Sequence, residues 1–294
     1  MLNYKNYKKT VICFLLPALL FYTAFLILPA CQTVVLSFFK WKGVGGTVFK
    51  FYGFKNYIQV FSDKTFWLSV SNLVKFLIIS MSTQLPLGFI LAYIISLQLK
   101  GHKFFKLSFF LPAVLSVTAI SLMWRMILSG NYGLVNTFLE VIGLESWTRS
   151  WLTDPKICFT VICLINTWLQ VGVTFVILLA GILNISEEMF EAAEIDGATR
   201  FDKIFRIIIP MTKDIIGICA ILIVTNTMKS FDLIYVLTNG SFGPGDINQV
   251  PTGLMYITSF IGENFGNGSV IAVFIMIMGG LLSSMLYFKS FQEE

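Results

Sequence analysis

Long, nearly uncharged apolar stretches constrain this chain more than any other feature of its sequence. About 20 apolar residues in a helix that rises 1.5 Å per residue cross the hydrocarbon core of a bilayer. Six stretches reach or approach that length: Val11–Phe39, Phe66–Leu97, Phe104–Leu128, Ile157–Leu183, Ile215–Leu237 and Val270–Phe288. With 56% hydrophobic and 13% charged residues, the 294-residue chain has more apolar surface than a soluble interior hides. We therefore predict an all-α, polytopic membrane protein with six transmembrane helices in one domain, residues 1–294.

The first stretch could be misread as a cleaved export signal, because Lys5, Lys8 and Lys9 precede it and Leu28–Cys31 faintly resembles a lipoprotein cleavage site. Its apolar run is much longer than the roughly 7–15 residues of a signal core. Proline beside the cleavage point also fits badly. We expect a retained first helix.

The distribution of Lys and Arg predicts the orientation in the membrane. An even number of spans places both termini on one side, and the segments on that side hold eleven basic residues against seven on the other. By the positive-inside tendency both termini are cytoplasmic in a bacterial-type plasma (inner) membrane, although five lysines in residues 40–64 weaken the signal.

Several function classes are excluded by what the sequence lacks. Its net charge of +5 is dispersed between apolar runs, so it does not form the dense basic face of a nucleic-acid binder. The five cysteines and the single His102 show no spacing typical of a metal site or a disulfide framework. No Gly-x-x-x-x-Gly-Lys-Ser/Thr loop is present, so we expect no nucleotide cofactor on this chain.

Residues 186–210, hereafter the elbow, form the one long connection predicted on the cytoplasmic side. Ser186 can cap a first short helix whose first turn holds Glu187 and Glu188, where the helix dipole favours anions. Gly197 permits the sharp backbone turn that ends it. Thr199 with Asp202 resembles a capping box for a second helix. A helix of about nine residues is too short to be stable alone, so we expect it to dock on a partner.

The elbow resembles the EAA signature of permease subunits in binding-protein-dependent ABC importers. The matching residues are Glu191, Ala192, Ala193, Gly197, Ile207 and Pro210, and Ile209 replaces the usual Leu. Asp196 with Gly197 and Ala198 matches the carbohydrate-uptake class related to the maltose and glycerol-phosphate systems. Further echoes are Leu111-Pro112, Trp124, Gly133–Asn136, Ala180-Gly181 and Phe231–Thr238.

This resemblance implies that the chain is one permease subunit of an ATP-binding-cassette importer for a sugar or sugar derivative. It implies a coupling helix at about Glu187–Asp196, seated on an ATPase subunit, with Glu191, Ala192, Ala193, Asp196, Gly197 and Pro210 at the joint. The implied partners are a second homologous permease, two nucleotide-binding subunits, an extracytoplasmic solute-binding protein and the lipid bilayer. The sequence ends without the Gly-rich tail of the second permease class, so a heterodimer is expected.

Polar residues inside the apolar stretches are candidates for a solute pathway, since such residues are costly unless they face a bundle interior or water. The candidates are Asn72, Arg125, Asn166, Asn226, Lys229 and Asp232. Interhelical hydrogen bonds or snorkelling to an interface would explain them equally well at several of these positions.

Three other classes of protein are weighed against the importer interpretation. An ion-coupled secondary transporter would need carboxylates near the membrane midplane and usually shows internal repeats, and only Asp232 is available. An intramembrane enzyme would need a metal or nucleophile constellation that the apolar stretches lack. A receptor or assembly factor would not require the elbow.

Overall fold

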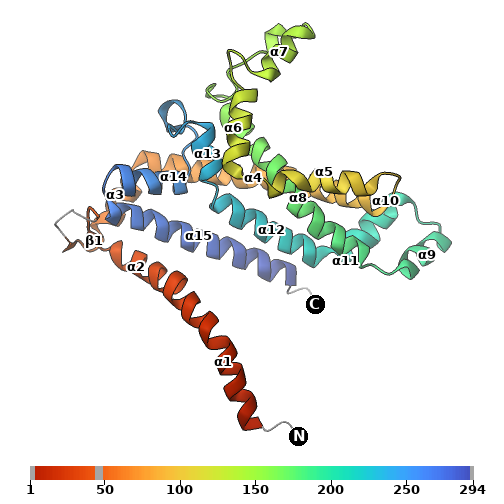
Figure 1. Cartoon of the computed structure of the whole chain (residues 1–294), viewed down its shortest axis with the longest axis horizontal. Helices are drawn as coiled ribbons and strands as arrows, with labels where there is room; N and C mark the ends of the chain where they lie inside the picture. The colour runs from red at the N-terminus through yellow and green to blue at the C-terminus, as the bar shows by residue number, and fades with distance from the viewer. Residues whose placement is uncertain (1–3, 44–48, 292–294) are drawn as a thin grey trace. The chain divides into compact units, whose positions relative to one another are not determined.

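The computed structural model describes residues 4–43 and 49–291, and it is predominantly helical (Figure 1). The helices are α1 (Tyr4–Tyr22), α2 (Leu28–Leu36), α3 (Lys55–Ser62), α4 (Lys64–Ser96), α5 (His102–Val114), α6 (Val117–Ile127), α7 (Leu134–Val141), α8 (Cys158–Leu183), α9 (Glu187–Ile195), α10 (Arg200–Lys203), α11 (Ile209–Met211), α12 (Lys213–Met228), α13 (Asp232–Leu237), α14 (Pro251–Tyr256) and α15 (Phe265–Phe291). Short π or 3-10 segments are η1 (Thr23–Ile27), η2 (Glu145–Trp147), η3 (Ile204–Ile208), η4 (Pro244–Asp246) and η5 (Ile257–Ile261). Among the described residues the only sheet pairs β1 (Phe39–Lys40) with β2 (Lys50–Phe51), so the all-α class is confirmed.

The chain divides into two compact units. The first comprises Met1–Phe66 with Leu254–Met276, and the second comprises Trp67–Gly253 with Ile277–Glu294. Both α4 and α15 run from one unit into the other.

In the first unit, α1, η1 and α2 form one continuous apolar helix over Val11–Leu36. The predicted first stretch ended at Phe39, but Phe39 lies in β1, where it pairs with Phe51. The buried Asn56 fastens this corner, because its Nδ2 donates to the carbonyl oxygens of Ser37 and Phe39 at 2.8 and 2.9 Å. The helix therefore ends where the backbone carbonyl groups bond to the Asn56 side chain and the chain enters the strand pair.

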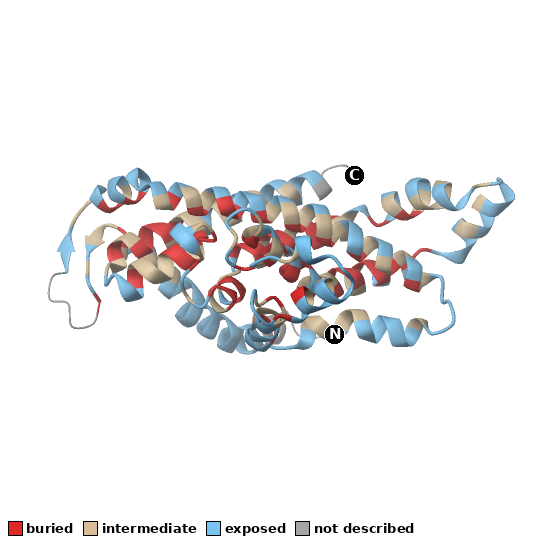
Figure 2. Ribbon diagram, turned by 90° about the horizontal axis from the view of Figure 1, so that it is seen from above, coloured by how far each residue is buried: buried red, intermediate tan, exposed pale blue. Residues whose placement is uncertain are grey.

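In the second unit, α8 is the central element, and Figure 2 shows buried residues concentrated along the packed helices. A buried cluster joins α4, α8, η3 and α12 through Ala92, Ile95, Phe175, Leu178, Leu179, Ile182, Ile185, Ile208 and Cys219. Small residues allow the helices to approach closely, as they do in membrane bundles. A Cβ on Gly172 of α8 would lie 2.6 Å from the carbonyl oxygen of Phe109 in α5, and a Cβ on Gly88 of α4 would lie 2.8 Å from Cγ2 of Thr174.

Within the described residues, four helical segments are long and apolar enough to cross a membrane: Val11–Leu36, Lys64–Ser96, Cys158–Leu183 and Phe265–Lys289. Two bent pairs raise the number to six if each pair is one span. The pairs are His102–Val114 with Val117–Ile127, bent by 99°, and Arg200–Met211 with Lys213–Met228, bent by 69°.

The predicted stretch Phe104–Leu128 is therefore broken in its middle. Leu115 and Ser116 have extended backbone angles, and Ser116 occupies the N-cap position of α6. Pro112 lies one turn before the break, and its ring removes a helical N–H donor. Proline inside an apolar stretch predicts a kink, yet α4 continues through Pro86, and the nearby Gly88 serves helix packing.

The predicted stretch Ile215–Leu237 is also two helices. The helix α12 ends at Met228, and α13 begins at Asp232, whose carboxylate lies in the first turn of the new helix. A carboxylate is favoured there by the helix dipole. The charged residues Lys229 and Asp232 thus flank a break and do not interrupt a continuous span.

Candidate functional site

The elbow folds as the sequence predicts, with a first helix, a turn and a second helix. The helix α9 covers Glu187–Ile195, with Ser186 at its N-cap position and Glu187 and Glu188 in its first turn. The Ser186 side chain makes no capping hydrogen bond, so the predicted cap is correct in position and wrong in its contact. Figure 1 shows α9 projecting at one end of the second unit.

Gly197 ends α9 in the left-handed region with φ +74°. The N–H of Gly197 donates to the carbonyl oxygen of Glu194 at 3.1 Å, and the N–H of Ala198 donates to that of Ala193 at 2.9 Å. This pair of bonds is the Schellman arrangement, which satisfies the last carbonyl groups of a helix. Glycine adopts the left-handed conformation without a Cβ penalty, so the turn depends on this residue type.

The predicted capping box opens α10 and is confirmed. The Thr199 Oγ1 accepts from the N–H of Asp202 at 3.3 Å, and the Asp202 carboxylate accepts from the N–H of Thr199 at 3.1 Å. Hydrogen bonds from the Thr199 side chain and backbone lower the pKa of Asp202, with a smaller contribution from Arg206. The segment continues through the π turn η3 to Pro210, which is exposed.

An ion pair links the two helices of the elbow. The Lys203 Nζ donates to the Glu194 carboxylate at 2.5 Å, and this bond lowers the pKa of Glu194. The sequence predicts that Glu191 and Glu194 both offer carboxylates to a basic partner. In the structure Glu194 is used within the chain, while Glu191 is exposed.

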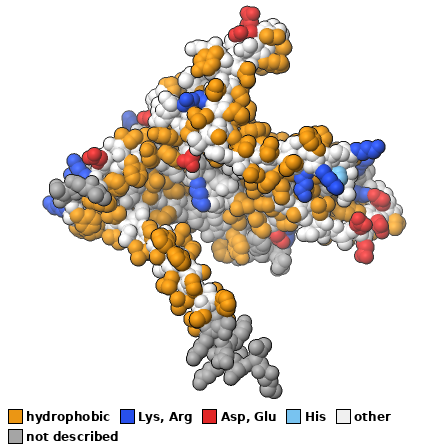
Figure 3. Space-filling view, viewed as in Figure 1, with side chains coloured by type: hydrophobic (Ala, Val, Ile, Leu, Met, Phe, Trp, Pro, Cys, Tyr) orange, Lys and Arg blue, Asp and Glu red, His pale blue; other side chains and the backbone are white. Residues whose placement is uncertain are grey.

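The outer surface of α9 combines acidic and apolar groups. Ile195 is 87% exposed and Met189 is 43% exposed, next to the exposed Glu191, Ala192 and Asp196, with Ala193 half-buried. Phe190 instead packs on the buried cluster of the second unit. Figure 3 shows acidic and basic side chains gathered at the end where α9 and α10 lie, in contrast to the hydrophobic surface of the long helices. One side of α9 is thus anchored and the other is open.

The candidate pathway residues do not converge on one site. Asn72 is buried, and its Nδ2 donates to the carbonyl oxygens of Ile247 and Gln249 at 2.8 and 2.9 Å, so it fastens a loop. Asn166 is buried on α8, and Asn226 is half-buried near the end of α12. Lys229 and Asp232 are exposed beside the helix break.

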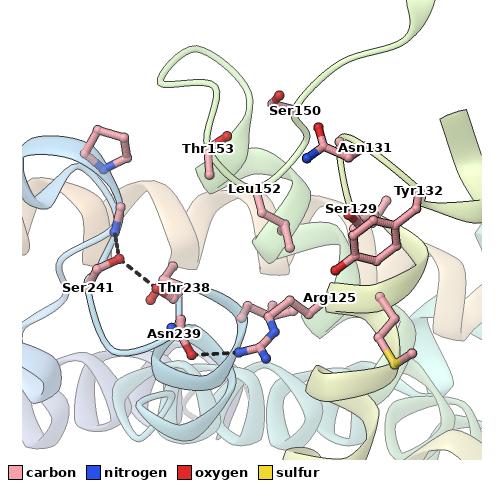
Figure 4. Close-up of a pocket in the computed structure, with 16 residues that line it drawn as sticks. Arg125, Ser129, Asn131, Tyr132, Ser150, Leu152, Thr153, Thr238, Asn239 and Ser241 are labelled. Atoms are coloured by element: carbon pink, nitrogen blue, oxygen red, sulfur yellow. Dashed lines mark hydrogen bonds between the residues drawn. The ribbon is translucent and has the colours of Figure 1, made fainter.

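Arg125 lies in a polar pocket of about 600 Å³ within the second unit (Figure 4). Its Nη1 donates to Asn239 Oδ1 at 2.9 Å, which joins the end of α6 to the loop after α13. The other five pathway candidates do not line this pocket.

The sequence did not reveal the role of Asn136, which holds the pocket-lining Gly130 in place. The buried Asn136 donates through Nδ2 to the carbonyl oxygens of Gly130 and Arg149, and its Oδ1 accepts from Trp151 Nε1 at 2.7 Å. The Gly133–Asn136 run was the available signal. That run resembles the family pattern, but it does not indicate that the Asn136 side chain bonds to the backbone of a loop.

Long apolar helices, an elbow with one open face and a polar pocket among loops define an integral-membrane transport component. No cluster of three or more His, Cys, Asp or Glu side chains suited to a metal ion occurs in the part of the chain described.

Residues 84–292 match the family described as "Binding-protein-dependent transport system inner membrane component", and the chain belongs to it. It is thus the permease component of an ABC importer, and ATP is hydrolysed on a separate subunit. This assignment gives no support to the ion-coupled alternative.

Relatives extend over nearly the whole chain. The "Probable ABC transporter permease protein YurN" of Bacillus subtilis is 34% identical, with 96% of each chain covered. The trehalose/maltose transport system permease protein MalF of Thermococcus litoralis is 30% identical over 90% of this chain and 88% of the relative. The lactose transport system permease protein LacF of Rhizobium radiobacter is 28% identical over 96% and 94%.

The fold is similar to that of a chain in a bacterial ABC transporter involved in the import of the acidic polysaccharide alginate. The TM-score is 0.83 at 22% sequence identity, and the match covers 99% of this chain and 98% of that chain. This likeness concerns the fold.

Proposed function

We propose that this permease moves a sugar or sugar derivative across the plasma membrane, driven by ATPase subunits that grip α9. Relatives at 28% and 30% identity are named for lactose and for trehalose/maltose transport, which supports a carbohydrate cargo. The single observation that carries the coupling part is the geometry of α9, a short helix anchored on one side and open on the other.

The packed side and the exposed side of α9 have different roles in this proposal. Phe190 and the Glu194–Lys203 ion pair hold α9 to the rest of the second unit, so a displacement of α9 is transmitted into the buried cluster. The exposed Glu191 and Ile195 offer a charge and an apolar contact to a groove on the ATPase subunit. An ATP-driven closure that moves the seated helix then shifts the population of inward-open and outward-open states.

The assembly that we propose contains this chain, a second homologous permease, two ATPase subunits and an extracytoplasmic solute-binding protein. Family membership supports it, since the family is binding-protein-dependent and is the inner membrane component. Both termini and the elbow lie on the cytoplasmic side in this arrangement.

Charge reversal on the open face of α9 tests the coupling role. We expect Glu191→Lys to leave insertion and helix content intact and to lower uptake and substrate-stimulated ATPase activity by about tenfold or more, equivalent to ~1.4 kcal/mol at the joint. Glu145→Lys is the matched control, because Glu145 is also exposed but lies in the loop between α7 and α8. Normal transport by the Glu191 variant, or equal loss in both variants, would contradict the proposal.

A further inference from the structure

The pocket around Arg125 is built by three segments that are distant in the sequence. The end of α6 contributes Arg125 and Leu128, the loop before α8 contributes Ser150 and Thr153, and the segment after α13 contributes Asn239. Its volume of about 600 Å³ lies within the roughly 300–1,000 Å³ of small-molecule sites. The enclosure is therefore large enough for a small sugar.

Among the residues that the structure describes, Arg125 is the only one with a charged side chain lining the pocket. Its one side-chain hydrogen bond in the structure goes to the neutral oxygen of Asn239, and no ion pair of Arg125 occurs within residues 4–43 and 49–291. A guanidinium has five N–H donors in a planar fork that matches a carboxylate or phosphate bidentately. A half-buried cation without a counter-ion keeps an unmet preference for an anion.

The rest of the lining is neutral and rich in hydrogen-bonding groups. Ser129, Asn131 and Tyr132 come from the loop after α6, and Ser150 and Thr153 from the loop before α8 (Figure 4). Hydroxyl and amide groups of this kind match the hydroxyl groups of a sugar. Tyr132 is 75% exposed, and the ring of a tyrosine offers an apolar face with a polar tip.

The orientation of Arg125 is fixed before any ligand arrives. Its bond to Asn239 holds one edge of the guanidinium. The Asn136 clamp holds the loop between Gly130 and Trp151 on the other side. A pre-arranged donor set lowers the ordering cost of binding.

From these observations we propose that the pocket is a subsite for a sugar derivative that carries an anionic group such as a carboxylate. Arg125 pairs with the anionic group, while the neutral groups of the two loops contact the sugar hydroxyls. The inference rests on the proposed function, because it names the class of cargo that this permease accepts.

Direct binding to the purified transporter complex in nanodiscs tests the proposal without its solute-binding protein. Three probes are compared by calorimetry: a neutral disaccharide, the same disaccharide with one sugar oxidised to its uronic acid, and acetate. We expect the wild type to bind the acidic disaccharide about tenfold more tightly than the neutral one, as a charge-assisted bidentate pair would give. Acetate should bind far more weakly than the acidic disaccharide.

Variants then assign the preference to the pocket. Arg125→Gln should lower the affinity for the acidic disaccharide about tenfold and so abolish the preference, whereas Arg125→Lys should retain part of it. Arg149→Gln is the control, because Arg149 is exposed, does not line this pocket and should keep the wild-type preference.

Four outcomes overturn the inference. They are equal binding of both disaccharides to the wild type, no detectable binding of either, acetate binding as tight as that of the acidic disaccharide, and equal losses in the Arg125→Gln and Arg149→Gln variants. If any of these occurs while neutral-sugar uptake still depends on Glu191, the proposed function stands and only the anionic subsite fails.

Discussion

Buried asparagine side chains act in this chain as clamps on backbone carbonyl groups. Asn56 holds the end of the first long helix, Asn72 holds the segment before α14, and Asn136 holds the loop before α8. Buried polar groups must be hydrogen-bonded, and an amide with two donors satisfies two carbonyl groups at once. A polar residue within an apolar stretch is therefore not by itself evidence for a solute path.

We predict that Asn72→Ala destabilises the protein without changing its choice of sugar. The substitution leaves the buried carbonyl groups near Ile247 and Gln249 without their donor, at a cost of roughly 1–3 kcal/mol. Thermal unfolding of the purified complex measures the loss, and competition uptake between sugars measures selectivity. Asn184→Ala is the control, because Asn184 is exposed. Altered selectivity at unchanged stability would return Asn72 to the pathway.

Gly197 is required for its backbone angle and not for its small size. A Cβ at this position would meet nothing within 4 Å, yet φ is +74°. The left-handed conformation costs an ordinary residue roughly 1–2 kcal/mol, and asparagine tolerates it better than a β-branched residue.

Gly197→Val should therefore uncouple ATP hydrolysis from uptake, while the equally uncrowded Gly197→Asn should retain most transport. The number of ATP molecules hydrolysed per sugar imported is the measurement. Equal transport by the two variants would show that the turn does not need the left-handed angle.

At the scale of elements, the N-cap residues of the two elbow helices, Ser186 of α9 and Thr199 of α10, can be compared directly. Thr199 makes its capping bond, and Ser186 occupies the same position on α9 without one. We predict that Thr199→Ala weakens the start of α10 by about 0.5–2 kcal/mol, whereas Ser186→Ala has little effect. Hydrogen exchange of residues 199–205 and 186–192 reports each helix start separately. Similar increases of exchange at both sites would contradict the assignment of the caps.

The helices that sequence predicts well are those whose signals are local. The span α4 lies within two residues of its predicted bounds, and the elbow shows its Gly197 turn and Thr199 cap because each depends on residues within one helical turn. In the third stretch Pro112 indicates a kink, but the full 99° break at Leu115–Ser116 was not predicted, because an apolar stretch gives composition and not the direction of the chain.

The polar site was only partly predictable, because its contacts are long-range. Arg125 was singled out, but its partner Asn239 lies 114 residues away in the sequence. The acceptor of Asn72 at Gln249 lies 177 residues away. A single sequence holds no local pattern for such pairs, so the clamp role of Asn72 could not be separated from a role in the pathway.

At the scale of the whole molecule, one hydrogen bond and one cavity favour counting each bent helix pair as a single membrane span. If neither pair crossed the membrane, four spans would place residues 128–157 and 229–264 on opposite sides. The Arg125–Asn239 bond links α6, which leads directly into the first of these segments, to a residue of the second segment. A cavity also joins Gln98 and Leu99 to Glu187 and Phe190, which four spans would likewise separate. If each bent pair is one crossing, the chain has six spans. Arg125 and Asn239 then lie on one side of the membrane, and the residues that line the cavity lie together on the other side.

Six crossings with cytoplasmic termini predict on which side of the membrane each loop lies. Chemical labelling of single introduced cysteines measures this side directly. With the five native cysteines replaced, Ser146→Cys should react with a membrane-impermeant maleimide added to intact cells. Gln98→Cys and Ser186→Cys should react only after the cytoplasmic face is opened, because Gln98 lines the cavity next to α9 and Ser186 is the N-cap residue of α9. All three positions are exposed, so accessibility within the fold does not limit labelling. Labelling of Gln98→Cys and Ser186→Cys from opposite sides would restore the four-span count. Labelling of both from outside would invert the orientation and remove α9 from any cytoplasmic ATPase.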